Sequence, residues 1–195
     1  MPDKGLIAWG RRQAARRGPR PPILWLFTDT ARLPDPRPAA RRLPAGISGI
    51  VLRHDSHPDR AAIGRDLARI CRARRLTLVV AGDARLAAAL GAGVHLRSGR
   101  WPGMVRPRRY GLIVTSSAHT VADLHRARAN GATVAFLSPA FPTLSHPGEA
   151  ALGPSRWLRL AATARMPVAA LGGLDGGNIR RLPGCAGAAA ISALA

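Results

Sequence analysis

The chain has 195 residues, of which 47% are hydrophobic, and this size and composition suit one domain with a buried core. Thirty lysines and arginines against ten acidic residues give a formal net charge of +20. The acidic residues include a single glutamate and no adjacent aspartates, which argues against a mechanism or a metal site built on paired carboxylates. No apolar run reaches the roughly 18 residues of a membrane span, so we expect a cytoplasmic protein without a membrane partner.

The basic residues are spread over predicted helix faces rather than gathered on one binding surface. Aromatic residues make up only 4% of the chain. Because nucleic-acid-binding surfaces combine clustered cations with stacking aromatics, we predict no nucleic-acid partner for most of the chain. Residues 1–21 are the exception: they form a basic N-terminal extension ahead of the main domain, residues 22–195. Binding of a polyanion by this extension stays open.

Short apolar runs alternate with helical segments along the main domain. Eight strands are predicted, at residues 23–28, 47–52, 76–81, 94–96, 112–115, 133–137, 168–171 and 188–191. Helical spacing occurs at 59–74, 83–90, 120–130 and 155–164, with Gly91 and Gly131 as C-terminal stops. Alternating strands and helices imply right-handed βαβ units and a parallel sheet. We therefore predict an α/β fold, a compact (β/α)8 TIM barrel.

The end of the sequence predicts that an eighth helix is missing from this barrel. Only four residues follow Ile191, the last residue of the eighth predicted strand. The flank between strands eight and one then needs another cover. Leu6, Ile7 and Trp9 of the N-terminal extension are candidates, and a second subunit of a homo-oligomer is the alternative.

Two predicted strands near the C-terminus end in small residues. Gly172 and Gly173 follow strand seven, and Ser192 follows strand eight. Glycines let backbone N–H groups approach an anion closely. In (β/α)8 barrels the loops after strands seven and eight commonly bind phosphate. These residues therefore predict a phosphorylated ligand.

Six short strings stand in a fixed order along the chain: Leu24-Trp-Leu-Phe-Thr-Asp29, Gly93-Val-His-Leu96, Ser117-Ala-His-Thr120, Ser138-Pro-Ala-Phe-Pro-Thr143, Ala170-Leu-Gly-Gly-Leu174 and Ala190-Ile-Ser-Ala-Leu194. In this order and spacing they resemble the thiamine phosphate synthase/TenI family from Ile23 onward. Each string alone is a weak signal, whereas six in register are specific.

The resemblance implies a (β/α)8 barrel of thiamin biosynthesis that handles a phosphorylated thiazole at its C-terminal mouth. It implies phosphate contacts at Gly173, Ile191 and Ser192. It also places Thr143 and Ser145 in the loop after strand six.

Departures from the family pattern concern the metal site of the synthases. The resemblance implies that synthases join thiazole phosphate to a pyrimidine pyrophosphate with Mg²⁺, which carboxylates at the ends of strands three and four help to bind. The matching positions here are Ala81-Gly82 and Arg100, while the pyrophosphate-contacting positions are kept as Arg53 and Ser117. Arg100, together with Arg53 and Arg97, could hold an anionic group without a metal ion.

The string Leu96-Arg-Ser-Gly-Arg-Trp101 is more similar to TenI, the thiazole tautomerase branch, which moves a proton and requires no cofactor. The resemblance places the general base of that branch on the strand-six loop, where this chain has Pro139, and proline cannot transfer a proton. His146, in the same loop, and His54, after strand two, are the candidate bases. With His57 nearby but no third ligand evident, no metal site is predicted.

Three functions remain open on this basis. The first hypothesis is a TenI-like protein that binds thiazole phosphate and catalyses its tautomerisation. The second is a thiamine phosphate synthase that uses Mg²⁺ and releases pyrophosphate. The third is a non-catalytic binder of a phosphorylated ligand.

Overall fold

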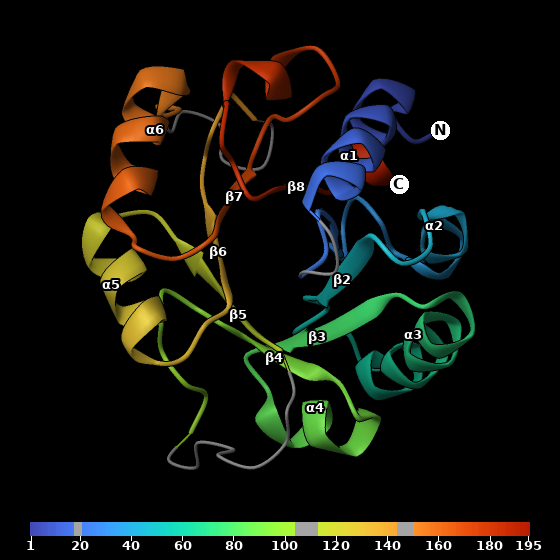
Figure 1. Cartoon of the computed structure of the whole chain (residues 1–195). Helices are drawn as coiled ribbons and strands as arrows, with labels where there is room; N and C mark the ends of the chain where they lie inside the picture. The colour runs from blue at the N-terminus through green and yellow to red at the C-terminus, as the bar shows by residue number, and fades with distance from the viewer. Residues whose placement is uncertain (18–20, 104–112, 144–149) are drawn as a thin grey trace.

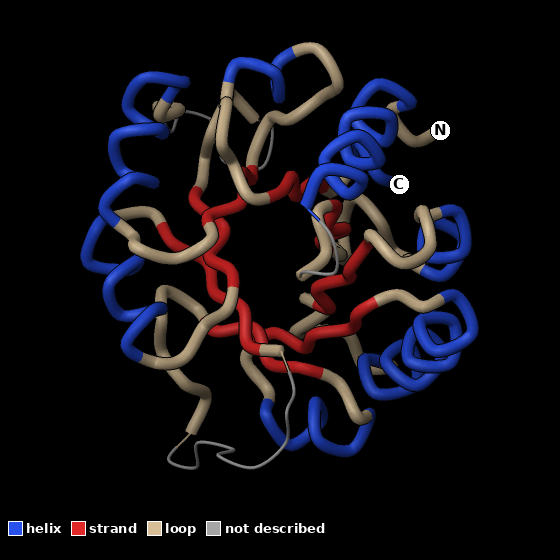
Figure 2. Tube along the Cα trace, viewed as in Figure 1, coloured by secondary structure: helices blue, strands red, loops and turns tan. Residues whose placement is uncertain are grey.

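The computed structural model describes residues 1–17, 21–103, 113–143 and 150–195 (Figure 1). Eight parallel strands follow one another around a closed barrel, from β1 to β8 and back to β1. Figure 2 shows the strands as an inner ring with helices outside it. The predicted (β/α)8 architecture is confirmed.

The strands are short, with four or five residues each, and every predicted strand overlaps one of them. They are β1 (Leu24–Phe27), β2 (Ser48–Leu52), β3 (Thr77–Ala81), β4 (Gly93–Leu96), β5 (Val114–Ala118), β6 (Val134–Leu137), β7 (Val168–Leu171) and β8 (Gly187–Ala190).

The fifth strand differs most from its prediction, because β5 extends to Ala118 rather than ending at Thr115. Its second half is Ser-Ser, which lacks the apolar signal of a buried strand. The polar side chains of β5 are hydrogen-bonded on both faces of the strand, with Thr115 toward the barrel interior and Ser116 toward the outer layer. Thr115 Oγ1 lies 2.9 Å from His95 Nδ1, and Ser116 Oγ accepts from the Gly99 amide at 2.9 Å. Burial of polar groups is tolerated when they are paired in this way.

The helices are α1 (Lys4–Arg17), α2 (Arg37–Arg42), α3 (Arg60–Arg74), α4 (Ala84–Leu90), α5 (Val121–Ala129) and α6 (Gly153–Thr163), with 3-10 turns η1 (Asn178–Arg181) and η2 (Ser192–Leu194). The four predicted helices correspond to α3 to α6. Helices α1 and α2 were not predicted from the sequence. Pro36 precedes α2 and Pro38 lies in its first turn, where proline is tolerated. Within the described residues, no helix has the length and apolar character needed to cross a membrane.

The barrel interior is filled by aromatic side chains from opposite strands. Trp25 and Phe27, two residues apart on β1, both point inward. Their rings meet Phe136 edge-on, with centroids 5.3 and 4.9 Å away. The Phe27 ring also meets His95 at 5.4 Å. These rings close the interior below the strands' C-terminal ends, so a ligand must bind above them.

Helix α1 lies beside β8 and the C-terminus, where the flank between β8 and β1 needs a cover (Figure 1). Leu6 and Trp9 are buried in the core between barrel and helices, as predicted, and Ile7 packs against it. Asp3 ties the helix start to the barrel, because its backbone N–H donates to the Ala193 carbonyl at 2.8 Å. The N-terminal segment therefore supplies this cover. The division of the chain after residue 21 stays a prediction.

Candidate functional site

The C-terminal ends of the strands form a mouth with two hollows. The first, which we call the cradle, has a volume of about 240 Å³. It is lined by Arg32, Pro142, Thr143, Leu171, Gly172, Gly173, Leu174, Ala190, Ile191, Ser192 and Ala193. Five residues that the sequence analysis assigned to phosphate or substrate binding thus surround one cavity: Thr143, Gly172, Gly173, Ile191 and Ser192.

The glycines after β7 are required by the shape of the cradle. Gly172 and Gly173 have φ angles of +96° and +64°, which disfavour any residue with a Cβ. A Cβ on Gly173 would lie 2.2 Å from the carbonyl oxygen of Pro142. The main chain of the loop after β7 therefore packs directly on the loop after β6. Backbone atoms thus form the wall of the cradle on this side.

The same loop is fixed from behind by a local turn. Asn178 donates from Nδ2 to the Gly173 carbonyl at 2.7 Å. Asp175 Oδ1 accepts from the backbone N–H groups of Gly177 and Asn178 at 2.8 and 2.7 Å. Asp3 Oδ2, from α1, accepts from the Gly176 N–H at 3.0 Å. The wall of the cradle is thus held by side chains that do not enter it.

The second hollow, which we call the arginine hollow, has a volume of about 360 Å³ and shares Leu171 with the cradle. Its lining consists of Phe27, Arg53, Asp55, Ala81, His95, Arg97, Ser98, Ser117, His119, Ser138 and Leu171. Arg53 and Ser117, both assigned to substrate binding from the sequence, therefore face the same space. Asp55 is its single acidic lining residue among those that the structure describes.

His95 forms the floor of the arginine hollow and is uncharged near neutral pH. It is buried, with Nδ1 2.9 Å from Thr115 Oγ1. Burial, the main cause, and the positive charges of Arg53 and Arg97 together lower the pKa of His95 to about 3. The charge of the hollow therefore comes from its arginines and Asp55.

The arginines around this hollow share few carboxylates. Asp55 pairs through Oδ2 with Arg97 and through Oδ1 with Arg60, the latter at 3.0 Å. Arg53 lies 3.9 Å from Asp29 Oδ2, a weak pairing, and its guanidinium sits over the Phe27 ring at 6.0 Å. Arg60 also lies 3.8 Å from Asp83. Among the residues that line the hollow, two guanidinium groups face one carboxylate, a positive excess that suits an anionic ligand.

The edge formed by β3 and β4 does not fit a magnesium site. Arg60 donates to the carbonyl oxygen of Ala81, and a Cβ on Gly82 would lie 3.0 Å from the Arg97 guanidinium. Guanidinium groups thus occupy the space where the family resemblance implies metal-binding carboxylates. Within the described ranges, no three or more His, Cys, Asp or Glu side chains gather to hold a metal ion. Asp55, already paired with two cations, is a poor ligand for a third.

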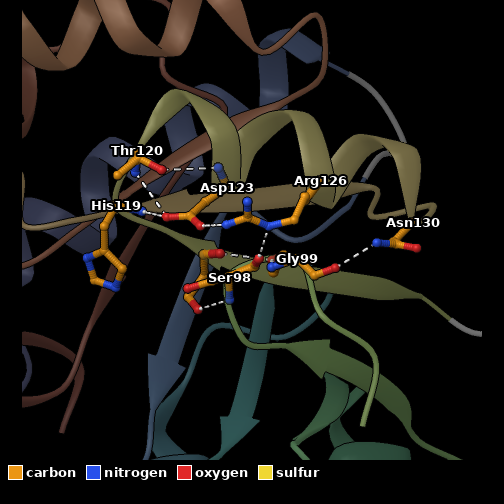
Figure 3. A network of polar contacts seen from close by, with 9 residues as sticks. Ser98, Gly99, His119, Thr120, Asp123, Arg126 and Asn130 are labelled. Carbon is orange, nitrogen blue, oxygen red and sulfur yellow. Dashed lines mark hydrogen bonds and ion pairs between the residues drawn. The ribbon is translucent and has the colours of Figure 1, made fainter. Parts of the chain in front are cut away.

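The loop after β4 is held on α5 by a polar network (Figure 3). Arg126 Nε donates to the Ser98 carbonyl at 3.1 Å, and Asn130 Nδ2 donates to the Gly99 carbonyl at 2.8 Å. Ser117 Oγ accepts from the Ser98 N–H at 3.1 Å. Asp123 pairs with Arg126 and completes the network. This network positions both Arg97 and Ser117.

The sequence analysis assigned no role to Asp123, Arg126 or Asn130. A local signal was available, because Thr120-x-x-Asp123 has the pattern of a capping box, in which each end residue accepts a hydrogen bond from the other's backbone. The contacts of Arg126 and Asn130 to the β4 loop span 28 and 31 residues. No local pattern reports such distant contacts.

Arg100 lies apart from both hollows. Its backbone pairs with Arg97 in an antiparallel bridge, and its side chain is exposed and does not line either cavity. Ser98 and Gly99, between the two arginines, have positive φ angles of 47° and 75°. Of the two arginines joined by this tight turn, Arg97 lines the arginine hollow. The cation that this loop contributes to the mouth is Arg97.

The candidate bases have different environments. His54 is fully buried, with Nδ1 2.9 Å from Thr28 Oγ1 and Nε2 donating to the Pro34 carbonyl at 3.2 Å. Both ring nitrogens are thereby engaged, and His54 lines neither hollow, contacts that favour a structural role. His146 and Ser145 lie outside the described residues. His119, which the sequence analysis did not select, lines the arginine hollow and donates from Nδ1 to the Ser138 carbonyl at 3.1 Å.

Comparisons with known proteins agree with this architecture. Residues 25–194 match the family model described as thiamine monophosphate synthase. The chain is 34% identical to a thiamine-phosphate synthase of Chlorobium luteolum, over 90% of this chain and 86% of that one. It is 35% identical to one of Halorhodospira halophila, over 87% and 85%.

A solved structure supports the fold. The thiamine phosphate pyrophosphorylase of Pyrococcus furiosus superimposes with a TM-score of 0.70 at 24% identity, over 87% of this chain and 85% of that one. The family match covers most of the chain, and the relatives align over nearly their whole lengths. The chain therefore belongs to the thiamine monophosphate synthase family.

Proposed function

We propose that this protein is a thiamine phosphate synthase, which joins thiazole phosphate to hydroxymethylpyrimidine pyrophosphate. The observation that carries the proposal is the pair of adjoining hollows, the cradle and the arginine hollow, each suited to an anion and separated by Leu171. A synthase has two anionic substrates, whereas a tautomerase has one. The names of the relatives support the same choice.

In this proposal the cradle binds the phosphate of the thiazole. The backbone of Gly173 and the side chains of Thr143 and Ser192 line it, and N–H and O–H groups are donors suited to phosphate oxygens. Binding by a fixed backbone wall orients the thiazole ring toward the arginine hollow. Such positioning lowers the entropic part of the barrier.

The arginine hollow binds the pyrophosphate of the second substrate. The thiazole nitrogen forms a bond to the methylene carbon of the pyrimidine while the carbon–oxygen bond to pyrophosphate breaks. Negative charge grows on the leaving oxygen in this step, so the guanidinium groups of Arg53 and Arg97 stabilise it, with Ser117 as a further hydrogen-bond partner. Formation of this bond requires no general base.

Tautomerisation of a thiazole carboxylate phosphate is the second candidate, and one observation favours it. His119 lines the mouth, and because its Nδ1 donates to Ser138 the Nε2 of a neutral ring carries the lone pair. Such a nitrogen can accept a proton from a ligand in the arginine hollow. His119 therefore replaces His54 as the base to test in this reaction.

The proposal is tested by incubating the protein with both substrates and measuring thiamine phosphate and released pyrophosphate. Ser192→Asp introduces a negative charge into the cradle, and we expect the KM for thiazole phosphate to rise about tenfold or more, because like charges in a binding site repel. Ala45→Asp is the control, since Ala45 is exposed in the turn before β2, at the opposite end of the barrel.

Proton exchange on the thiazole, followed by NMR and lost in His119→Ala, would instead support the tautomerase. Binding of thiazole phosphate without either reaction would indicate a non-catalytic binder. A cytoplasmic location, a homo-oligomeric state and the absence of a nucleic-acid partner stay predictions.

A further inference from the structure

The arginine hollow carries an excess of fixed positive charge where the family resemblance implies a metal ion. Two guanidinium groups, those of Arg53 and Arg97, line it with Asp55 as the acidic lining residue, and Arg60 adjoins it, paired with Asp55 and with Asp83. A divalent cation placed there would meet two lining guanidinium groups and one lining carboxylate already in two ion pairs. Electrostatics therefore disfavours the cation and favours a polyanion.

The two lining arginines act on the same space. Arg53, Arg97 and the floor residue His95 line the same hollow, and both positive charges contribute to the lowered pKa of His95. Arg53 follows β2 and Arg97 follows β4, so the two guanidinium groups come from different walls of the hollow. A pyrophosphate group has several oxygens that two such forked donors can hold at once.

We propose that Arg53 and Arg97 form a subsite that binds the pyrophosphate group without a divalent cation. The identity of the pyrophosphate ester rests on the proposed function, whereas binding of the anion itself does not. The Arg97 guanidinium, close to Gly82 and to its partner Asp55, supplies the positive charge that a metal ion would otherwise provide.

The test measures binding of inorganic pyrophosphate by calorimetry in EDTA, at fixed ionic strength, with the full chain. We expect binding in EDTA that Mg²⁺ does not strengthen. Arg97→Ala should weaken it about tenfold or more, as loss of a charge-assisted hydrogen bond does. Arg97→Lys should restore part of the affinity, because lysine keeps the charge but not the fork. Arg69→Ala is the matched control, an exposed arginine on α3 that forms an ion pair with its own helix neighbour Asp66 and lines neither hollow.

The variant Asp55→Asn distinguishes a guanidinium subsite from a metal site. In a guanidinium subsite the change removes a competing negative charge, so pyrophosphate binding in EDTA should be equal or tighter. In a metal site the same change would remove a ligand and weaken binding measured with Mg²⁺. Thermal unfolding of each variant verifies that it is folded.

Either of two results would overturn the subsite: binding that requires Mg²⁺, or binding in EDTA that is unchanged in Arg97→Ala. These results are distinct from failure of the proposed function. A protein that binds pyrophosphate in EDTA through Arg97 but makes no thiamine phosphate keeps the subsite and loses the synthase. One that makes thiamine phosphate only with Mg²⁺ keeps the synthase and loses the subsite.

Discussion

The cradle and the arginine hollow adjoin one another, but main chain shapes the first and long side chains shape the second. The cradle wall is main chain, with Gly172 and Gly173 packed against the loop after β6. The arginine hollow depends on long side chains, and Arg97 has 59% of its side chain exposed. Backbone walls fix one geometry, whereas exposed guanidinium groups adapt and are screened by salt. One barrel mouth thus combines a rigid site for one anion with an adaptable site for another.

The largest effect is expected from a substitution that disrupts the backbone wall of the cradle. Gly173→Ala combines a positive φ with a Cβ that would overlap the Pro142 carbonyl, so we expect loss of thiazole phosphate binding and a marked drop in the free energy of unfolding. Gly91→Ala is the matched control, because Gly91 has φ +62° and open space around it. That variant should lose only about 1–2 kcal/mol, the conformational cost of a left-handed residue.

Thermal unfolding and phosphate-ligand calorimetry on both glycine variants measure the difference. Equal destabilisation of the two proteins, with ligand affinity intact in each, would contradict a cradle shaped by close backbone packing. Pyrophosphate binding in the arginine hollow should persist in Gly173→Ala if the protein is folded, which would show that the two sites are built independently.

A smaller effect is expected from a change at Asp3, which holds the loop after β7 from behind the cradle. Hydrogen bonds from the backbone N–H groups of Gly176 and Leu6 lower the pKa of Asp3 below its usual 3.8. A lowered pKa in the folded state means that ionised Asp3 stabilises the protein above about pH 4, and that this stability is lost as the pH falls through the folded value. Asp3→Asn should cost about 1 kcal/mol at pH 7, because the amide has a single acceptor oxygen and cannot accept from both the Leu6 and the Gly176 N–H groups.

Melting temperatures between pH 7 and pH 2.5 check this prediction, since the loss of stability in acid should be shallower in Asp3→Asn than in the parent. Asp59→Asn is the control, because Asp59 precedes α3 without a side-chain capping hydrogen bond. An identical pH profile for Asp3→Asn and the parent would rule out the role of Asp3 in holding α1 to the β7 loop.

The smallest effect concerns the support behind the arginine hollow. Asn130→Ala removes the hydrogen bond to the Gly99 carbonyl, which is worth about 1 kcal/mol, and loosens the loop that presents Arg97. We expect pyrophosphate affinity to fall about threefold, a fraction of that energy, with thiazole phosphate affinity unchanged. Calorimetry with each ligand measures the split, and Arg128→Ala on the same helix is the control. Equal losses for both ligands would mean that the hollows are not independent.

The sequence predicted the barrel and the cradle because both depend on local signals. Each strand is a short apolar run, and the cradle glycines directly follow one. The arginine hollow was harder to predict because neighbours in sequence point to different places. Arg53 enters the hollow while His54, the next residue, is buried beneath Pro34. Arg97 lines the hollow and Arg100 does not, although both belong to the same tight turn after β4. Side-chain direction after a strand end depends on such turns, which charge and spacing do not encode.

The position of α1 bears on how the chain folds during synthesis. Asp3 bonds to Ala193 and Leu6 is fully buried. The first helix lies against Leu24 of β1 as well, but it acquires the rest of its packing surface only after the eighth strand has been made. Until then Leu6 and Trp9 have no completed barrel to cover, and contacts so distant in sequence form slowly. We therefore expect a nascent chain to present an arginine-rich segment with uncovered Leu6 and Trp9 until β8 is made, which is a segment that a chaperone could recognise.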